Sequence, residues 1–128
     1  MRRAGWLFMR ASGILLLVFV FGHIITNLVL GDGVQQINFA FVAGKWASPL
    51  WQLWALLLLV LALLHGANGI RTIIYDYAKQ PLSRGIWLAA LGLVTGVIGA
   101  LGALIIFTFD PCPPGAPMEL LPSFCPVI

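Results

Sequence analysis

Three long apolar stretches are the feature of this sequence that most limits its fold. They run from about 6 to 30, about 48 to 75 and about 85 to 109. Each is longer than the roughly 20 residues that an α-helix needs to cross about 30 Å of hydrocarbon. With 61% hydrophobic and 9% charged residues, the chain lies far outside the range of soluble domains. The sequence therefore predicts an all-α integral membrane protein, a three-helix bundle forming one domain over residues 1–128.

The remaining segments are short. The apolar run that follows Arg2 and Arg3 is longer than a signal-peptide core and lacks a small-residue cleavage site, so we interpret it as the first span. Residues 34–45 predict a short helix at the membrane surface, and the outer tail, 110–128, holds most of the eight prolines and is expected to be irregular. Three spans make only a small bundle, which we expect to complete its packing against partner subunits. Small residues form a stripe in the third span that predicts close helix contacts: Gly92, Gly96, Gly99 and Ala103.

Basic residues predict the orientation of the spans in the membrane. Six of the seven flank one side of the predicted helices: Arg2, Arg3, Arg10, Arg71, Lys79 and Arg84. Only Lys45 lies on the other side. Because basic residues concentrate in cytoplasmic segments, the N-terminus is predicted in the cytoplasm and the C-terminal tail outside. The sequence pI near 9.3 is explained by this bias, and no nucleic-acid partner is expected.

A histidine lies within the second span, in a motif that also contains two glycines and an arginine. Gly66 and Gly69 follow His65 by one and four positions, and Arg71 comes two residues later. Imidazole is the commonest protein ligand of haem iron, the glycines leave space for a flat group, and an arginine can pair with a propionate. Alternatively, His65 hydrogen-bonds a neighbouring helix and the glycines only allow close packing. The spacing alone leaves both interpretations open.

A second histidine, His23, lies within the first span and shares a helix face with Thr26 and Asn27. It is expected either to bind a second haem or to bond a polar group of a neighbouring helix. The predicted spans place the two imidazoles roughly 12 Å apart along the membrane normal. They therefore cannot bind one iron atom together.

The run from 64 to 69 carries a family resemblance. Together with Asp76 and Tyr77, eleven and twelve residues after His65, it resembles the small membrane-anchor subunit of succinate dehydrogenase, of the D type. Residues 8–13 resemble the start of the first helix in that family. The three-span topology agrees, so the resemblance covers most of the chain.

The resemblance implies that His65 is an axial ligand of haem b and that the C-type anchor subunit supplies the other ligand. It also implies that Tyr77, supported by Asp76, faces a quinone site near the iron–sulfur subunit. The second histidine, His23, resembles anchors of the two-haem, menaquinone-reducing type, which gives two haems per complex. Arg10 and Arg71 either determine topology only or bind haem propionates, and the quinone is menaquinone or ubiquinone.

We therefore expect a membrane anchor of a succinate:quinone oxidoreductase, the respiratory complex II of the tricarboxylic acid cycle, in a bacterial or archaeal cytoplasmic membrane. It would bind the iron–sulfur and flavoprotein subunits and contact lipid, and the complex could form a higher oligomer. The chain itself would not oxidise succinate. The alternatives are a fumarate reductase anchor and a haem-free structural or assembly subunit. In the tail, Cys112 and Cys125 form either a disulfide or two free thiols.

Overall fold

The computed structural model describes residues 3–126, and this range contains helices, turns and irregular segments but no β-strand. Three helical segments are long and apolar enough to cross a membrane: Arg3–Val29, Pro49–Tyr77 and Pro81–Thr108. The first segment consists of α1, Arg3–Ile24, continued by one π-helical turn, Ile25–Val29. The prediction of an all-α protein with three spans is confirmed.

Prolines mark the starts of the second and third spans. Pro49 begins α3 (Pro49–Tyr77) and Pro81 begins α4 (Pro81–Thr108). A proline in the first turn of a helix loses no hydrogen bond, because the N–H groups there have no partner within the helix. The helix α4 therefore begins four residues before the expected start near residue 85, since its polar first turn extends beyond the apolar run.

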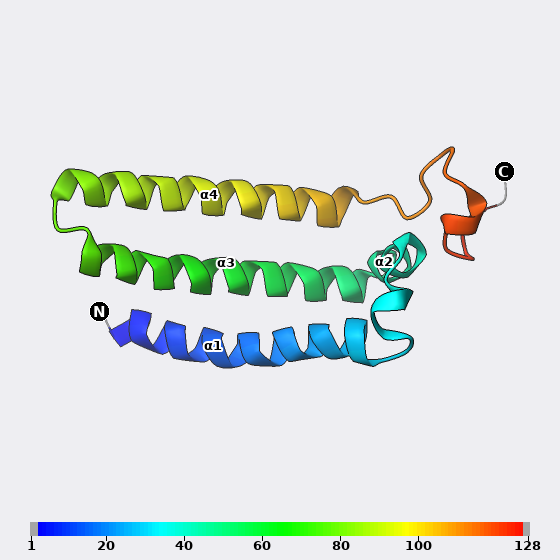
Figure 1. Cartoon of the computed structure of the whole chain (residues 1–128), viewed down its shortest axis with the longest axis horizontal. Helices are drawn as coiled ribbons and strands as arrows, with labels where there is room; N and C mark the ends of the chain where they lie inside the picture. Colours follow the sequence, from blue (N-terminus) through cyan, green and yellow to red (C-terminus); the bar gives the residue numbers. More distant parts are fainter. Residues whose placement is uncertain (1–2, 127–128) are drawn as a thin grey trace.

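The three long helices lie side by side in one layer, with α3 between α1 and α4 (Figure 1). The N-terminus and the α3–α4 connection lie at one end, which we call the N-terminal end. The short helix α2 (Phe39–Trp46) and the C-terminal tail lie at the other, which we call the disulfide end. Because α3 has a neighbour on only two sides, both faces of the layer stay uncovered. Five of the described residues are buried: Ser12, Ala43, Ile106, Pro122 and Cys125.

Glycines set the distance between α1 and α3. A Cβ added to Gly22 would lie 2.8 Å from Cζ2 of Trp54, so only glycine lets this indole approach the α1 backbone. The Trp54 ring also stacks on Phe19, with 4.5 Å between the ring centroids. Gly13, ten residues before His23, likewise faces a ring of α3: an added Cβ there would lie 3.4 Å from Cε1 of His65. The two helices therefore meet along a glycine-lined contact.

The contact between α3 and α4 uses one glycine of the predicted stripe, Gly99, and one outside it, Gly102. A Cβ added to Gly99 would lie 3.3 Å from Leu63, and one added to Gly102 would lie 2.6 Å from Leu59. At Gly92 and Gly96, two members of the stripe, an added Cβ would meet nothing within 4 Å. The stripe therefore packs against α3 only in its second half, and its first half lies on an uncovered face.

At the disulfide end, Lys45 of α2 is tied to the end of the first span. The π-helical turn is closed by the Leu30 amide, which donates to the carbonyl oxygen of Ile25 at 2.9 Å. The Lys45 ammonium donates to the carbonyl oxygen of Thr26 at 3.2 Å and to Oδ1 of Asn27 at 3.0 Å. Burial lowers the pKa of Lys45 from its ordinary value of 10.5, because desolvation penalises the charged form.

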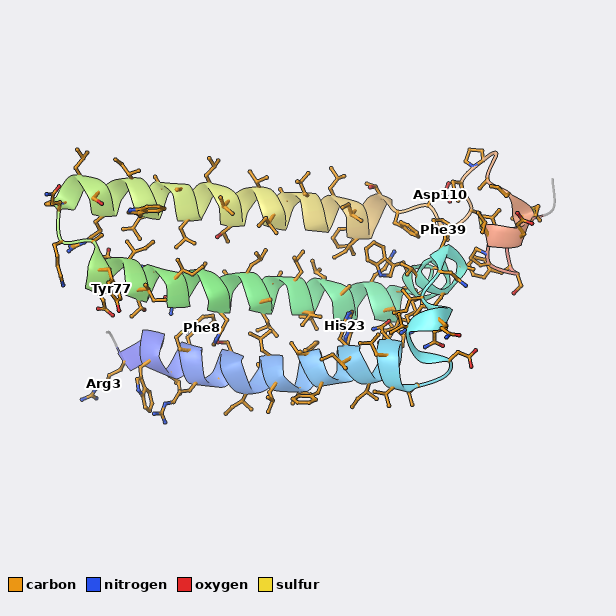
Figure 2. All side chains as sticks on the ribbon, in the orientation of Figure 1. Arg3, Phe8, His23, Phe39, Tyr77 and Asp110 are labelled. Carbon is orange, nitrogen blue, oxygen red and sulfur yellow. A yellow bond between two sulfur atoms is a disulfide. The ribbon has the colours of Figure 1, made fainter. Side chains whose placement is uncertain are left out.

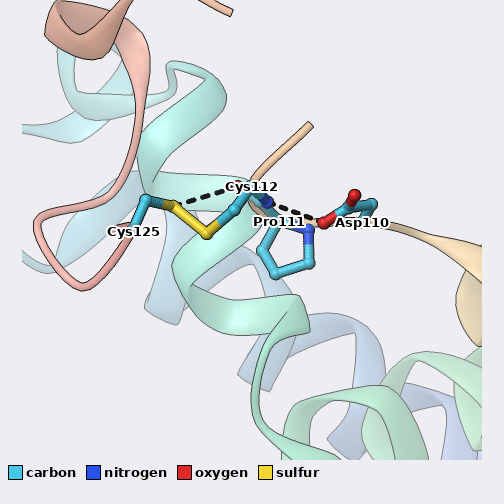
Figure 3. The surroundings of a disulfide bond; sticks show 4 residues. All are labelled: Asp110, Pro111, Cys112 and Cys125. Atoms are coloured by element: carbon cyan, nitrogen blue, oxygen red, sulfur yellow. Dashed lines mark hydrogen bonds between the residues drawn. A yellow bond between two sulfur atoms is a disulfide. The ribbon is translucent and has the colours of Figure 1, made fainter. Parts of the chain in front are cut away.

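The C-terminal tail folds back on α2 through one aromatic side chain and is closed by a disulfide. Phe109 packs edge-on against Trp46, with 5.1 Å between ring centroids. Cys112 and Cys125 are bonded to each other, and the amide of Cys112 donates to a carboxylate oxygen of Asp110 at 2.9 Å (Figure 3). Of the two alternatives for these cysteines, the structure confirms the disulfide.

The distribution of basic residues along the layer follows the prediction. Five lie toward the N-terminal end: Arg3, Arg10, Arg71, Lys79 and Arg84. Lys45 lies at the disulfide end, and Arg2 falls outside the described residues. At the α3–α4 connection, the Arg84 guanidinium donates through Nε and Nη2 to the carbonyl oxygen of Ala78. It thereby satisfies a backbone group that the end of α3 leaves open.

Candidate functional site

The best-defined polar contact inside the layer joins His65 of α3 to Ser12 of α1. Nδ1 of the imidazole lies 2.9 Å from the serine Oγ. Ser12 is only 2% exposed, so the contact is closed off from its surroundings. A Cβ added to Gly13 would lie 3.4 Å from Cε1 of the ring, so the imidazole lies directly against the α1 backbone. His65 remains half-buried, and its Nε2 has no hydrogen-bond partner within residues 3–126.

The two glycines after His65 have different surroundings. A Cβ added to Gly66 would meet nothing within 4 Å, so the surface beside the histidine is open there. At Gly69 the added Cβ would lie 3.8 Å from Cε of Met9, an ordinary contact with α1. Gly66 therefore leaves space for a flat ligand, as its sequence position suggests, whereas Gly69 is covered by the neighbouring helix.

Arg10 and Arg71 are the two candidate propionate ligands. Both lie between His65 and the N-terminal end of the layer, and both stack on aromatic rings. The Arg10 guanidinium lies 4.2 Å from the centroid of the Trp6 ring, and that of Arg71 lies 5.6 Å from the centroid of Tyr75. Such stacking orients a guanidinium while leaving its N–H groups available to an anion. Among the described residues neither arginine forms an ion pair with a carboxylate, so both remain available to acidic groups of a ligand or partner.

A cavity of about 510 Å³ lies at the N-terminal end, between α1 and α3. Its lining residues include Asn68, Arg71 and Asp76, and the small Ala4 and Gly5 of α1 leave it open. It therefore offers a cation, an amide and a carboxylate to a polar ligand.

Tyr77 does not share the cavity that Asp76 lines. Its side chain is 81% exposed and lines a separate cavity of about 280 Å³ beside α4, which also contains Ser83 and Trp87. The structure thus brings Asp76 and Arg71 to one cavity and places Tyr77 apart from both. The carboxylate and the phenol form no hydrogen bond with each other in the described part of the chain.

His23 lies on the side of α1 that faces α3, near the disulfide end (Figure 2). It lines a cavity of about 350 Å³ together with Asn27, Lys45 and three indole rings, among them Trp54. The π-helical turn begins two residues later, and its altered spacing lets Asn27 donate through Nδ2 to the backbone oxygen of His23 at 2.6 Å. The imidazole itself has no hydrogen-bond partner among residues 3–126, and Nε1 of Trp54 is buried without one. Around this cavity, both ring nitrogens of His23 and the indole nitrogen of Trp54 therefore lack a partner in the described part of the chain.

The two histidines are separated along α1. His23 lies ten residues after Gly13, which is opposite the His65 ring. At 1.5 Å per residue, the imidazoles are about 15 Å apart along the helix axis, somewhat more than the roughly 12 Å expected from the sequence. Within residues 3–126 no three histidine, cysteine or acidic side chains converge on a point that could hold a metal ion. A metal ion at either histidine would therefore need ligands from outside the described residues.

This donor set fits haem and does not fit a bare metal ion. Haem iron needs only axial ligands from protein, and a half-buried imidazole with one ring nitrogen engaged and the other free is such a ligand. His65 meets this description and has open surface beside it at Gly66. His23 does not meet it within this chain, because its side chain is exposed and neither ring nitrogen has a hydrogen-bond partner among the described residues.

Sequence reasoning missed the two side chains that most define these surroundings, Ser12 and Trp54. Ser12 stands in the motif Arg10-Ala11-Ser12-Gly13, and its small neighbour was a usable sign of a close helix contact. Which residue of α1 faces His65 depends on the rotation and offset of two helices, and a single sequence does not give these. Trp54 stands near the start of the second span, where tryptophans are favoured at the membrane boundary, yet its ring packs between α1 and α3.

Three membrane-length helices, with one imidazole held between two of them, define a small multi-span membrane protein. The family described as "Succinate dehydrogenase/Fumarate reductase transmembrane subunit" matches residues 3–102. The chain belongs to this family, which confirms the resemblance seen in the sequence. Comparison with curated proteins gave no match.

Proposed function

We propose that this chain is the small, D-type anchor subunit of a succinate:quinone oxidoreductase. The supporting observation is that the family match covers His65 together with the α1 residues that hold its Nδ1. The uncovered faces of the layer, rich in exposed leucine, isoleucine and valine, support packing against a C-type anchor subunit. The iron–sulfur and flavoprotein subunits would dock at the N-terminal end, where the basic residues gather.

In this proposal His65 is an axial ligand of haem b through Nε2, and His23 ligates a second haem about 15 Å away along the axis. When bound, the haems supply one-electron carriers between the iron–sulfur subunit and quinone. The chain itself would provide part of each site: the open surface at Gly66 for one haem, and the cavity that His23 lines for the other. The second axial ligands would come from the C-type anchor.

Arg10 and Arg71 would pair with haem propionates, or with a quinone carbonyl in the case of Arg71. Both guanidiniums are oriented by aromatic rings and free of carboxylates within the described chain. For quinone, the 510 Å³ cavity that Arg71 and Asp76 line is favoured over the surface at Tyr77. Within this recess Arg71 can donate to a quinone carbonyl, and the Asp76 carboxylate can accept from a hydroxyl group of the quinol. Menaquinone and ubiquinone present the same carbonyl acceptors to it.

The orientation that fits these features has the N-terminal end in the cytoplasm of a bacterial or archaeal cell. Five basic residues lie toward that end, and the disulfide lies at the opposite end, where an oxidising environment would maintain it. A C-terminal fusion tests this orientation. Alkaline phosphatase fused after the tail is expected to be active, and a cytoplasmic-folding fluorescent protein is expected to be dark; the reverse pattern would contradict it.

Haem content of the purified complex is the decisive experiment. We expect two haems per complex. His65→Ala should remove the absorption bands of one haem, and His23→Ala should remove those of the other. Leu64→Ala, which changes an exposed neighbour of His65, is the matched control and should keep both. His65→Ala should also lower the yield of complex, because a bound cofactor stabilises the folded state. Retention of both haems in His65→Ala would refute the ligand assignment, and one haem in the wild type would refute a role for His23.

Two other functions remain distinct outcomes. An anchor of fumarate reductase would give the same spectra, and the relative rates of succinate oxidation and fumarate reduction with each quinone would distinguish it. A structural or assembly subunit without haem would show no absorption bands at all. The His65–Ser12 hydrogen bond would then serve only as a contact between α1 and α3.

A further inference from the structure

The hydroxyl group of Ser12 makes more contacts than it has protons to donate. Its Oγ lies 2.6 Å from the backbone oxygen of Phe8, 3.3 Å from that of Met9 and 2.9 Å from Nδ1 of His65. A serine hydroxyl carries one hydrogen and two lone pairs. The contacts therefore decide which of these groups donates.

The carbonyl oxygen of Phe8 has no hydrogen, so a 2.6 Å contact with the serine oxygen requires the hydroxyl to donate there. Were the hydroxyl to point at His65 instead, two oxygen atoms would face each other at this distance with no hydrogen between them. The remaining contact, with Nδ1 of His65, is then a bond in which the ring N–H donates and Oγ accepts. Ser12 thereby determines where the imidazole carries its hydrogen.

We propose that Ser12 is a positioning residue that holds His65 as the Nδ1–H tautomer and presents the lone pair of Nε2 to a haem iron. A neutral imidazole has its hydrogen on one nitrogen only, so occupation of Nδ1 leaves Nε2 free as a ligand. The bond also fixes the plane of the ring, which lies against the α1 backbone at Gly13. This inference deepens the proposed function and rests on His65 being a haem ligand.

The bond to Ser12 also adjusts the strength of the ligand. An acceptor on the Nδ1 hydrogen makes an imidazole more basic and a stronger electron donor to a metal at Nε2. A stronger donor stabilises the oxidised state of iron relative to the reduced state. Loss of the acceptor is therefore expected to raise the midpoint potential of the haem and to weaken haem retention, on the order of tenfold or more.

The chain contains a matched control for the other role of this hydroxyl. Thr108 donates to the backbone oxygen of Leu104 at 2.6 Å, the same bond within one helix that Ser12 makes with Phe8. Thr108 is the last residue of α4 and lies toward the disulfide end of the layer. It makes no hydrogen bond to a histidine among the described residues. Thr108→Ala thus removes a helix-bonded hydroxyl without affecting an imidazole.

The experiment uses the complete complex, with Ser12→Ala, Ser12→Thr and Thr108→Ala compared with the wild type. Redox titration gives the midpoint potential of each haem, and haem per complex gives its retention. We expect Ser12→Ala to raise one potential and lower the haem content, Ser12→Thr to restore both by returning an acceptor, and Thr108→Ala to change neither. The haem affected should be the one that His65→Ala removes.

The outcomes separate this inference from the proposed function. A wild-type complex without haem refutes the proposed function and the inference with it. If the wild-type complex contains haem, and Ser12→Ala changes neither the midpoint potential nor the haem content, the inference alone is refuted. If the alanine variant does not assemble, Ser12→Cys decides, because it is similar in size and sulfur is a weak acceptor: a raised potential supports the role of Ser12, and an unchanged one overturns it.

Discussion

Replacement of Gly22 by alanine is the sharpest test of how α1 and α3 meet. The added Cβ would lie 2.8 Å from Cζ2 and 3.0 Å from Cη2 of Trp54. Carbon atoms in contact prefer separations of about 3.5–4.0 Å, so the shortfall is roughly 0.5–1 Å at two atoms of a rigid ring. The ring cannot easily move away, because it stacks on Phe19 at 4.5 Å and contacts the Trp51 ring edge-on at 6.5 Å. The helices must therefore separate.

Overpacking of this kind costs about 1–3 kcal/mol. Alanine also has a better helix propensity than glycine, by up to about 1 kcal/mol, and this gain partly hides the cost. Gly96→Ala in α4 gains the same propensity without a clash, since its Cβ would meet nothing within 4 Å. Gly102→Ala is intermediate: its Cβ would lie 2.6 Å from Cδ2 of Leu59, but a leucine end can rotate away. The difference in stability between Gly22→Ala and Gly96→Ala therefore measures the cost of the clash with Trp54.

The assay is the melting temperature of the purified complex in detergent, followed by tryptophan fluorescence. We expect Gly22→Ala to melt a few degrees below Gly96→Ala, with Gly102→Ala between them. The Trp54 emission should also change in Gly22→Ala, because its ring is the group that the new methyl displaces. A Gly22→Ala complex that is as stable as Gly96→Ala would show that the glycine is not needed for the approach of Trp54.

Three further outcomes are expected. Replacing both Cys112 and Cys125 by serine should lower the free energy of unfolding by about 3 kcal/mol, as loss of a short disulfide loop predicts, and rapid alkylation of unreduced, denatured wild type would show that no disulfide forms. The folded chain holds the Lys45 proton less tightly than the unfolded chain does, so the free energy of unfolding should rise as pH increases from the lowered pKa to 10.5. NMR titration of the Lys45 amine, labelled by methylation, measures that pKa directly. A midpoint at 10.5 would contradict the desolvation argument. In quinone reduction assays, Arg71→Gln should raise the KM for quinone more than Tyr77→Phe does, because Arg71 is the cation that lines the favoured cavity; the opposite order would place the quinone at the Tyr77 surface.

The spans were predictable because hydrocarbon imposes one simple requirement. A segment that crosses it must satisfy its own backbone hydrogen bonds and expose apolar side chains, and both properties are visible in the sequence. The prolines at 49 and 81 could have given the helix starts more closely. The importance of His65 was also visible, because an imidazole in an apolar run is costly without a purpose.

The arrangement of the spans was not predictable in the same way. In a soluble protein a helix shows which face is buried through its polar residues, but here lipid-facing and helix-facing residues are equally apolar. The flat layer, the pairing of Ser12 with His65 and the covering of Gly69 by Met9 depend on helix rotation. Asp76 and Tyr77 were expected to act together as sequence neighbours, yet adjacent residues on a helix point about 100° apart, and they line different cavities.

The π-helical turn at Ile25–Val29 has a consequence for comparing this chain with relatives. Its hydrogen bond from the Leu30 amide spans five residues instead of four, so the turn accommodates one residue more than an α-helical turn would. Two chains that differ by one residue at this point can therefore follow the same path on both sides of it. An alignment should place its gap here and nowhere earlier in the first span. An alignment shifted by one position would match His23 with a residue that points about 100° away around the helix.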